Sequence, residues 1–257
     1  MPRSLSLLKH DLRRASGAHA EIMENPVTFG VAAIDARLGG GLAHRGLHEF
    51  FAATAEDASA AAGFAVMLAM RASNGRPLVW VREKRCARNS GQLHAAGLGE
   101  LGFDPGSLVL VDADDTLAVL RASADAVKCS PVGAVVIEPW GKASPYDLTA
   151  SRRLSMAAAA SGVFTLVVRA DADPLPSAAQ TRWQVASAPS SPLPADAPGH
   201  PAFDITLLRH RGGVAGLEAR VEWNRDTRSF APLPGRLPAV PAVGTDQAPF
   251  FVQPIAA

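Results

Sequence analysis

Few residues of this chain have the types and spacing that chemistry requires. His44 and His48 are four residues apart, but Gly46 lies between them and no third ligand is evident, so no metal site is predicted. The two cysteines, Cys86 and Cys129, form no CxxC pair, which argues against a disulfide framework or a zinc site. No GxSxG motif or catalytic triad can be recognised. The sequence therefore predicts neither a metal centre nor nucleophilic catalysis.

Basic residues offer a second kind of chemistry, contact with phosphate groups. One basic cluster consists of Arg82, Lys84, Arg85 and Arg88. Solvated surface is the simpler interpretation of that cluster. Arg209 and Arg211 would share one face of an extended strand, which suits DNA phosphates or an acidic partner. Because the formal net charge is only +1, we expect any contact with DNA to be indirect or weak.

Apolar runs of strand length alternate with helical segments along most of the chain. The predicted strands span residues 47–52, 78–82, 107–113, 133–139 and 163–170. The predicted helices between them span residues 57–73, 89–98, 115–128 and 147–161. Near-continuous apolar strands separated by helices indicate a parallel sheet that is covered on both faces. The sequence therefore predicts an α/β fold with a mostly parallel sheet flanked by helices.

The pattern changes in the C-terminal third of the chain. Residues 189–201 are rich in Pro, Ser and Ala and are predicted to form an exposed linker or long loop. Two extended segments follow, 203–211 and 217–225, joined by a loop that opens with Gly212 and Gly213. They predict a C-terminal β-hairpin that extends the sheet along one edge.

Three regions are expected along the chain. Residues 1–25 form an amphipathic helix and a linker, residues 26–231 form the α/β domain, and residues 232–257 form a proline-rich flexible tail. The helix carries three leucines on one face: Leu5, Leu8 and Leu12. The tail ends in an apolar patch that contains Phe250 and Phe251.

The composition predicts a globular protein outside the membrane. Of the 257 residues, 48% are hydrophobic, which is enough to bury a core. No segment approaches the roughly 20 apolar residues of a membrane span, and the N-terminus has no cleavable signal pattern. The cysteine content suits a reducing compartment. We therefore expect a cytoplasmic protein without a membrane partner.

Residues 28–42, TFGVAAIDARLGGGL, and residues 45–51, RGLHEFF, resemble the beginning of the RecA core. The resemblance implies a RecA-like P-loop core. In that family the first strand runs into a phosphate loop of the form GxxxxGK[ST], whose amides and lysine hold the phosphates of ATP while the hydroxyl reaches magnesium.

The corresponding eight residues here are Ala52, Ala53, Thr54, Ala55, Glu56, Asp57, Ala58 and Ser59. Ala52 and Asp57 replace the two glycines, so backbone conformations that need no Cβ become costly. Ala58 replaces the lysine, while Glu56 and Asp57 bring negative charge to the place of the triphosphate. Only Ser59 is kept. The resemblance thus implies a degenerate phosphate loop, with neither ATP nor another cofactor bound.

Two acidic residues occupy positions that matter in RecA-like enzymes. Glu138 ends the strand that carries the magnesium-associated acid, and Glu83 lies near the carboxylate that activates water. We interpret both as vestigial, because a general base needs a bound substrate within hydrogen-bond reach. A RecA-like ATPase with an atypical phosphate loop is the alternative that would use them.

Within the RecA-like proteins, the chain is most similar to the ImuA family of bacterial inducible-mutagenesis cassettes. The similar passages are VIEPWG (136–141), SRRLSMAAAASGV (151–163), PSAAQTRWQV (176–185), ITLLRHRGG (205–213) and VEWN (221–224). The similarity covers about residues 28–231. It implies a non-enzymatic accessory protein of the SOS-induced translesion mutasome, with ImuB and an error-prone replicative-type DNA polymerase as partners. SulA, a cell-division inhibitor that binds FtsZ and is also a RecA-like remnant, gives the alternative function.

The same resemblance suggests where partners bind. In RecA an N-terminal helix packs on the neighbouring protomer, so the helix at residues 3–17 is predicted to dock on a RecA-like neighbour or on ImuB. Its alternative is to cover the core of its own chain. Phe250 and Phe251 form a second candidate surface, because short apolar motifs on disordered tails commonly fold on binding.

Overall fold

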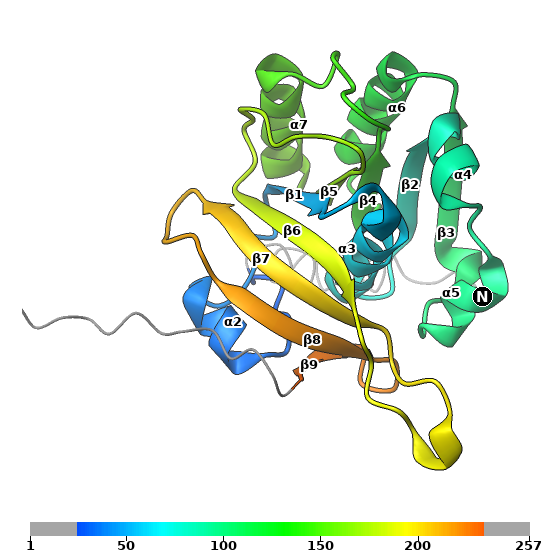
Figure 1. Ribbon diagram of the computed structural model, residues 1–257. Helices are drawn as coiled ribbons and strands as arrows, with labels where there is room; N and C mark the ends of the chain where they lie inside the picture. Colours follow the sequence, from blue (N-terminus) through cyan, green and yellow to red (C-terminus); the bar gives the residue numbers. More distant parts are fainter. Residues whose placement is uncertain (1–24, 234–257) are drawn as a thin grey trace, which may run out of the picture.

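The computed structural model describes residues 25–233. The predicted helix with Leu5, Leu8 and Leu12 and the apolar patch with Phe250 and Phe251 lie outside the described residues. Within them, one sheet has the strand order β3-β2-β4-β5-β1-β6-β7-β8-β9 (Figure 1).

Six strands of the sheet run parallel to one another. They are β1 (Leu47–Ala52), β2 (Leu78–Glu83), β3 (Leu108–Ala113), β4 (Ala134–Glu138), β5 (Phe164–Arg169) and β6 (Thr181–Ala188). Three antiparallel strands continue the sheet beyond β6. They are β7 (Ala202–His210), β8 (Glu218–Asn224) and β9 (Ser229–Pro232). The predicted α/β class and mostly parallel sheet are therefore confirmed, as are the five predicted parallel strands.

Helices cover both faces of the parallel part of the sheet. The described α-helices are α2 (Ala32–Arg37), α3 (Ala58–Ser73), α4 (Lys84–Ser90), α5 (Ala95–Glu100), α6 (Thr116–Lys128) and α7 (Leu148–Ser161). Helix α3 packs on one face, and α6 and α7 pack side by side on the other (Figure 1). Because successive side chains of a strand point to opposite faces, Trp80 joins the core under α3 and Val81 joins the core under α6 and α7. This alternation also decides on which face each charged residue lies.

The sequence-based assignment of elements was wrong at three places. The single helix predicted at residues 89–98 is two short helices, because Gly91 ends α4 with φ +86° and the chain turns before His94 caps α5. Strand β6 was missed, since Thr181, Arg182 and Gln184 interrupt its apolar run. Strand β9 at the edge of the sheet was also missed, although the predicted hairpin of β7 and β8 is confirmed and extends the sheet next to β6.

Residues 189–201 form the long loop expected from their composition. The loop joins the neighbouring strands β6 and β7 and contains a short 3-10 turn, Pro194–Asp196. In Figure 1 it is the yellow loop that projects away from the sheet. It is therefore a connection within the sheet and does not link two domains.

The LGGGL segment and the preceding Ile-Asp pair have structural tasks. Ile34 is completely buried, and the carboxylate of Asp35 accepts hydrogen bonds from the backbone N–H groups of Phe29 (2.7 Å) and Gly30 (3.0 Å). Gly41 has φ +136°, and a Cβ at this position would lie 2.5 Å from the carbonyl oxygen of Val27. The residues that carry the resemblance here are needed to fold the segment that leads into β1.

Among residues 25–233, no helix combines the length and the apolar character needed to cross a membrane.

Candidate functional site

The segment from Ala52 to Ser59 connects β1 to α3 at the carboxyl edge of the parallel sheet. Residues Ala55–Asp57 form a 3-10 turn, and the N–H of Ala53 donates to the carbonyl of Val185 in β6 (2.9 Å). No residue of this segment has a positive φ. The backbone thus avoids the conformations for which phosphate loops use glycine.

The carboxylate of Asp57 links this segment to β6 by hydrogen bonds. Its Oδ1 accepts hydrogen bonds from the N–H (2.8 Å) and the hydroxyl (2.9 Å) of Ser187, and its Oδ2 accepts from the N–H (3.2 Å) and the hydroxyl (2.8 Å) of Thr54. Burial alone would raise the pKa of Asp57, but these hydrogen bonds stabilise the charged form and the pKa lies below its ordinary value. A protein carboxylate therefore joins the loop to β6 as a fixed negative charge.

The neighbours of Asp57 offer no cation and few free polar groups to a phosphate. Ala58, at the lysine position, is 2% exposed in the first turn of α3. Glu56 is exposed and adds a second negative charge beside the turn. The hydroxyl of Ser59, the one kept residue, donates to the carbonyl of Ser90 (3.1 Å). Asp57 is the N-cap residue of α3, but its side chain makes no capping hydrogen bond to that helix.

Glu138 lies in a buried ion pair. Its Oε2 accepts hydrogen bonds from the guanidinium of Arg82 (2.8 Å) and from the indole N–H of Trp80 (2.9 Å). Glu138 is 1% exposed, and burial raises its pKa even though the Arg82 charge acts in the opposite direction. Burial also raises the pKa of the neighbouring Cys86 thiol, whose Sγ donates to the carbonyl of Glu138 (3.3 Å). This arrangement fits a structural ion pair better than a magnesium ligand.

Glu83 is also buried, and both of its carboxylate oxygens accept hydrogen bonds. Its Oε2 accepts hydrogen bonds from the hydroxyl of Thr116 (2.9 Å) and the N–H of Trp140 (3.2 Å), and its Oε1 accepts from Arg85. Thr116 begins α6, on the face of the sheet opposite α3, whereas Glu138 pairs with Arg82 and Trp80 on the α3 face. The two acids that the sequence grouped together are thus separated by the sheet.

A second buried polar cluster was not predicted. Glu49, in the middle of β1, accepts hydrogen bonds from the Tyr146 hydroxyl (2.6 Å) and the Arg182 guanidinium (2.7 Å). Arg169 lies 5.1 Å from the centroid of the Tyr146 ring and donates to the carbonyls of Gly141 (3.0 Å) and Lys142 (3.2 Å). Burial raises the pKa of Tyr146 well above its ordinary value, and the Glu49 charge adds to the effect. Charged residues inside otherwise apolar strands were the signal in the sequence.

Most of the basic residues singled out in the sequence form ion pairs or hydrogen bonds with other residues of the same chain. Lys84 pairs with Asp114, and Arg85 pairs with Glu83. Arg209 is half-buried and donates to the carbonyl of Ser177 (3.2 Å), whereas Arg211 lies one residue beyond β7 and is exposed. Arg82, which we interpreted as solvated surface, is 4% exposed in its ion pair with Glu138, so that interpretation was wrong.

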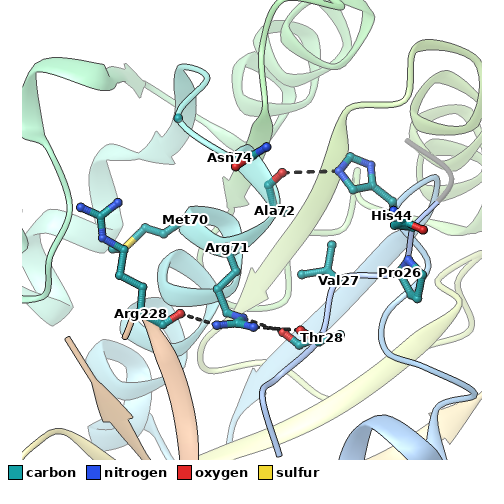
Figure 2. Close-up of a pocket in the computed structure, with 11 residues that line it drawn as sticks. Pro26, Val27, Thr28, His44, Met70, Arg71, Ala72, Asn74 and Arg228 are labelled. Carbon is teal, nitrogen blue, oxygen red and sulfur yellow. Dashed lines mark hydrogen bonds between the residues drawn. The ribbon is translucent and has the colours of Figure 1, made fainter. Parts of the chain in front are cut away.

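A hollow of about 400 Å³ lies at the opposite edge of the sheet, near the C-terminal end of α3 (Figure 2). Figure 2 shows the guanidinium of Arg71 between Thr28 and Arg228. It donates to the carbonyl (2.6 Å) and hydroxyl (2.8 Å) of Thr28 and to the carbonyl of Arg228. Because α3 has 16 residues, this hollow lies roughly 24 Å from the segment Ala52 to Ser59. The guanidinium of Arg71 thus links α3 to the segment before α2 and to the turn before β9.

No group of His, Cys, Asp or Glu residues within the described range is arranged to hold a metal ion. His44 and His48 contact backbone carbonyls and core aromatic rings instead.

Comparison with known proteins identifies the family. No protein-family model matches the chain. Two curated proteins, each called Protein ImuA and each from a strain of Caulobacter vibrioides, are 35% identical to it over 206 residues. The matched region covers 74% of this chain and 80% of each relative. Similarity of this extent shows common descent, and the chain belongs to the ImuA family.

Proposed function

We propose that this chain is a non-catalytic adaptor of SOS-induced mutagenesis, built on a RecA-like core that no longer binds nucleotide. Its family supports a role in the ImuA and ImuB mutagenesis system. The observation that carries the loss of nucleotide binding is the Asp57 carboxylate, which accepts four hydrogen bonds in the loop where a triphosphate would need cations and free amides. The protein then acts through contacts with other proteins.

ImuB is the proposed direct partner, and through it an error-prone replicative-type DNA polymerase in translesion synthesis. RecA is a further candidate partner. Any contact with DNA is indirect or weak in this proposal, because three of the six basic residues singled out in the sequence already pair with acids of the same chain. The six are Arg82, Lys84, Arg85, Arg88, Arg209 and Arg211. The proposed location is the cytoplasm.

Two measurements on the full chain test the proposal. Titration calorimetry with ATP and magnesium is expected to give no binding heat, and immobilised protein is expected to retain purified ImuB without nucleotide. Tight magnesium-dependent ATP binding, with turnover reduced by Glu83→Gln or Glu138→Gln, contradicts the loss of nucleotide binding. Inhibition of FtsZ polymerisation without ImuB binding contradicts the adaptor role and supports the SulA-like alternative.

A further inference from the structure

The α6–α7 groove is a wide hollow on the surface of this protein. It has a volume of about 700 Å³ and is lined by residues of α6 and α7. Figure 1 shows these two helices side by side on one face of the sheet. Each helix turns one stripe of residues toward it, at intervals of three and four. The lining residues of α6 are Leu117, Leu120, Arg121, Ala124 and Lys128, and those of α7 include Ala150, Arg153, Leu154, Met156 and Ala157.

The groove is apolar and open to solvent. Alanines at positions 124, 150 and 157 leave space between the helices for a side chain from outside. Leu117 is 45% exposed and Met156 is 66% exposed, although both are large apolar residues. Clustered exposed apolar side chains of this kind mark interaction surfaces in soluble proteins.

The charges around the α6–α7 groove are mainly positive. Arg121, Lys128 and Arg153 are exposed, and none of them forms an ion pair with another residue in the range 25–233. The one acid in the lining, Asp147, uses its carboxylate to cap α7, where it accepts from the N–H of Ala150 (2.7 Å). An apolar segment that carries carboxylates therefore fits this groove by charge.

The charges also argue against two other occupants of the groove, an end of the same chain and a second copy of the protein. Residues 1–24 carry more basic than acidic residues, and residues 234–257 contain one of each, so neither end of the chain is acidic. Two copies of the groove placed face to face in a symmetric dimer would bring the same cations together. The complementary charge must come from a different protein.

We propose that the α6–α7 groove receives an acidic amphipathic segment of ImuB, with its apolar side chains between the helices and its carboxylates on Arg121, Lys128 and Arg153. The inference rests on the proposed function, since it names the surface through which the adaptor holds its partner. Apolar anchors supply most of the affinity, and the cations select the sign of the partner's charge.

The first test measures the affinity of purified ImuB for full-length variants. We expect Met156→Glu, and separately Arg121→Glu with Arg153→Glu, each to weaken binding about tenfold or more. Two variants outside the groove serve as controls, Val214→Glu for a 61% exposed apolar residue and Arg88→Glu for an exposed cation. Equal binding of ImuB by the wild type and the groove variants overturns the groove, whereas failure of the wild type to bind ImuB overturns the proposed function and the inference with it.

The second test follows oxidation of Met156 by hydrogen peroxide with mass spectrometry. We expect fast oxidation of Met156 in the free chain and protection in the ImuB complex, while the buried Met67 stays protected in both. Fast oxidation of Met156 in the complex overturns the proposal. Protection of Met156 in the free chain also overturns it. Sedimentation then shows whether a second copy or the chain itself covers the groove.

Discussion

The carboxylate of Asp57 accepts hydrogen bonds from both the N–H and the hydroxyl of Ser187, a residue 130 positions further along the chain. This contact joins the segment after β1 to the end of β6. A phosphate loop leaves its amides free for the ligand. Here the Asp57 carboxylate is the anion, and its hydrogen bonds join the segment after β1 to β6.

The first prediction concerns the stability that Asp57 contributes. Asp57→Ala leaves the N–H and hydroxyl of Ser187 without their acceptor, and we expect the free energy of unfolding to fall by about 1–3 kcal/mol. Urea unfolding at pH 7 measures the change. Glu56→Ala is the matched control, because Glu56 is exposed, and its substitution is expected to change stability by about 0.5 kcal/mol or less.

The lowered pKa of Asp57 gives this prediction a pH dependence. A carboxylate whose pKa is lower in the folded state adds stability above its unfolded pKa of about 3.9 and loses it as the pH falls through the folded value. The difference between wild type and Asp57→Ala should therefore shrink between pH 5 and pH 2 in urea unfolding. A difference that grows as the pH falls contradicts the assignment.

The second prediction concerns Ala58, which stands where the proposed phosphate loop would carry its lysine. Ala58 is 2% exposed against the core, so Ala58→Lys places a long cationic side chain where there is no space for it. We expect the free energy of unfolding to fall by about 1–3 kcal/mol, with no gain of ATP binding in calorimetry. Ala55→Lys, at an exposed position of the same loop, should leave stability nearly unchanged.

The third prediction separates a structural from a catalytic role of Glu138. Glu138→Leu leaves the buried Arg82 guanidinium uncompensated, and we expect a loss of about 3–5 kcal/mol of unfolding free energy. Arg82→Met together with Glu138→Leu should be less destabilised than Glu138→Leu alone, because no buried charge is left unpaired. A stable Glu138→Leu protein contradicts the structural assignment.

Sequence reasoning predicted the parallel strands because each is a short apolar run bounded by Gly, Pro or Asp. It missed β6 because Arg182 in that strand is polar, and only the folded chain shows that Glu49 neutralises it. Arg82 and Glu138 were assigned separately for the same reason, since 56 positions lie between them. The departure of Glu56, Asp57 and Ala58 from the phosphate-loop pattern was visible in the sequence. The partner of Asp57, Ser187, was not, because its contact depends on the tertiary fold.

The fourth prediction concerns the LGGGL segment. Gly41→Ala should lower the free energy of unfolding by about 2 kcal/mol or more, because its φ of +136° disfavours L residues and the new Cβ would lie 2.5 Å from the Val27 carbonyl oxygen. Gly39→Ala is the control. Its φ of +73° is also positive, but no atom lies within 4 Å of a Cβ there, and we expect about 1 kcal/mol. Equal losses measured by urea unfolding would contradict the close approach at Gly41.

The last prediction concerns His48, which is completely buried in β1. The carbonyl of Ala43 can only accept, so the Nε2–H of His48 donates to it (3.0 Å), and Nδ1 accepts from the Thr181 hydroxyl (2.8 Å). Both contacts fit a neutral ring. Burial lowers the pKa of His48 from 6.5 to about 4, and the nearby His210 and His44 act in the same direction.

Between these two pKa values the unfolded chain binds more protons than the folded one at His48, so stability rises with pH in this range. We expect the free energy of unfolding to fall by about 2 kcal/mol between pH 7 and pH 5 from this group. His48→Gln should remove this part of the pH dependence, although it also lowers stability at pH 7. His200→Gln should keep it, because His200 lies in the loop between β6 and β7 and is only half-buried. If urea unfolding gives the same slope with pH for His48→Gln and the wild type, His48 is not buried as a neutral ring.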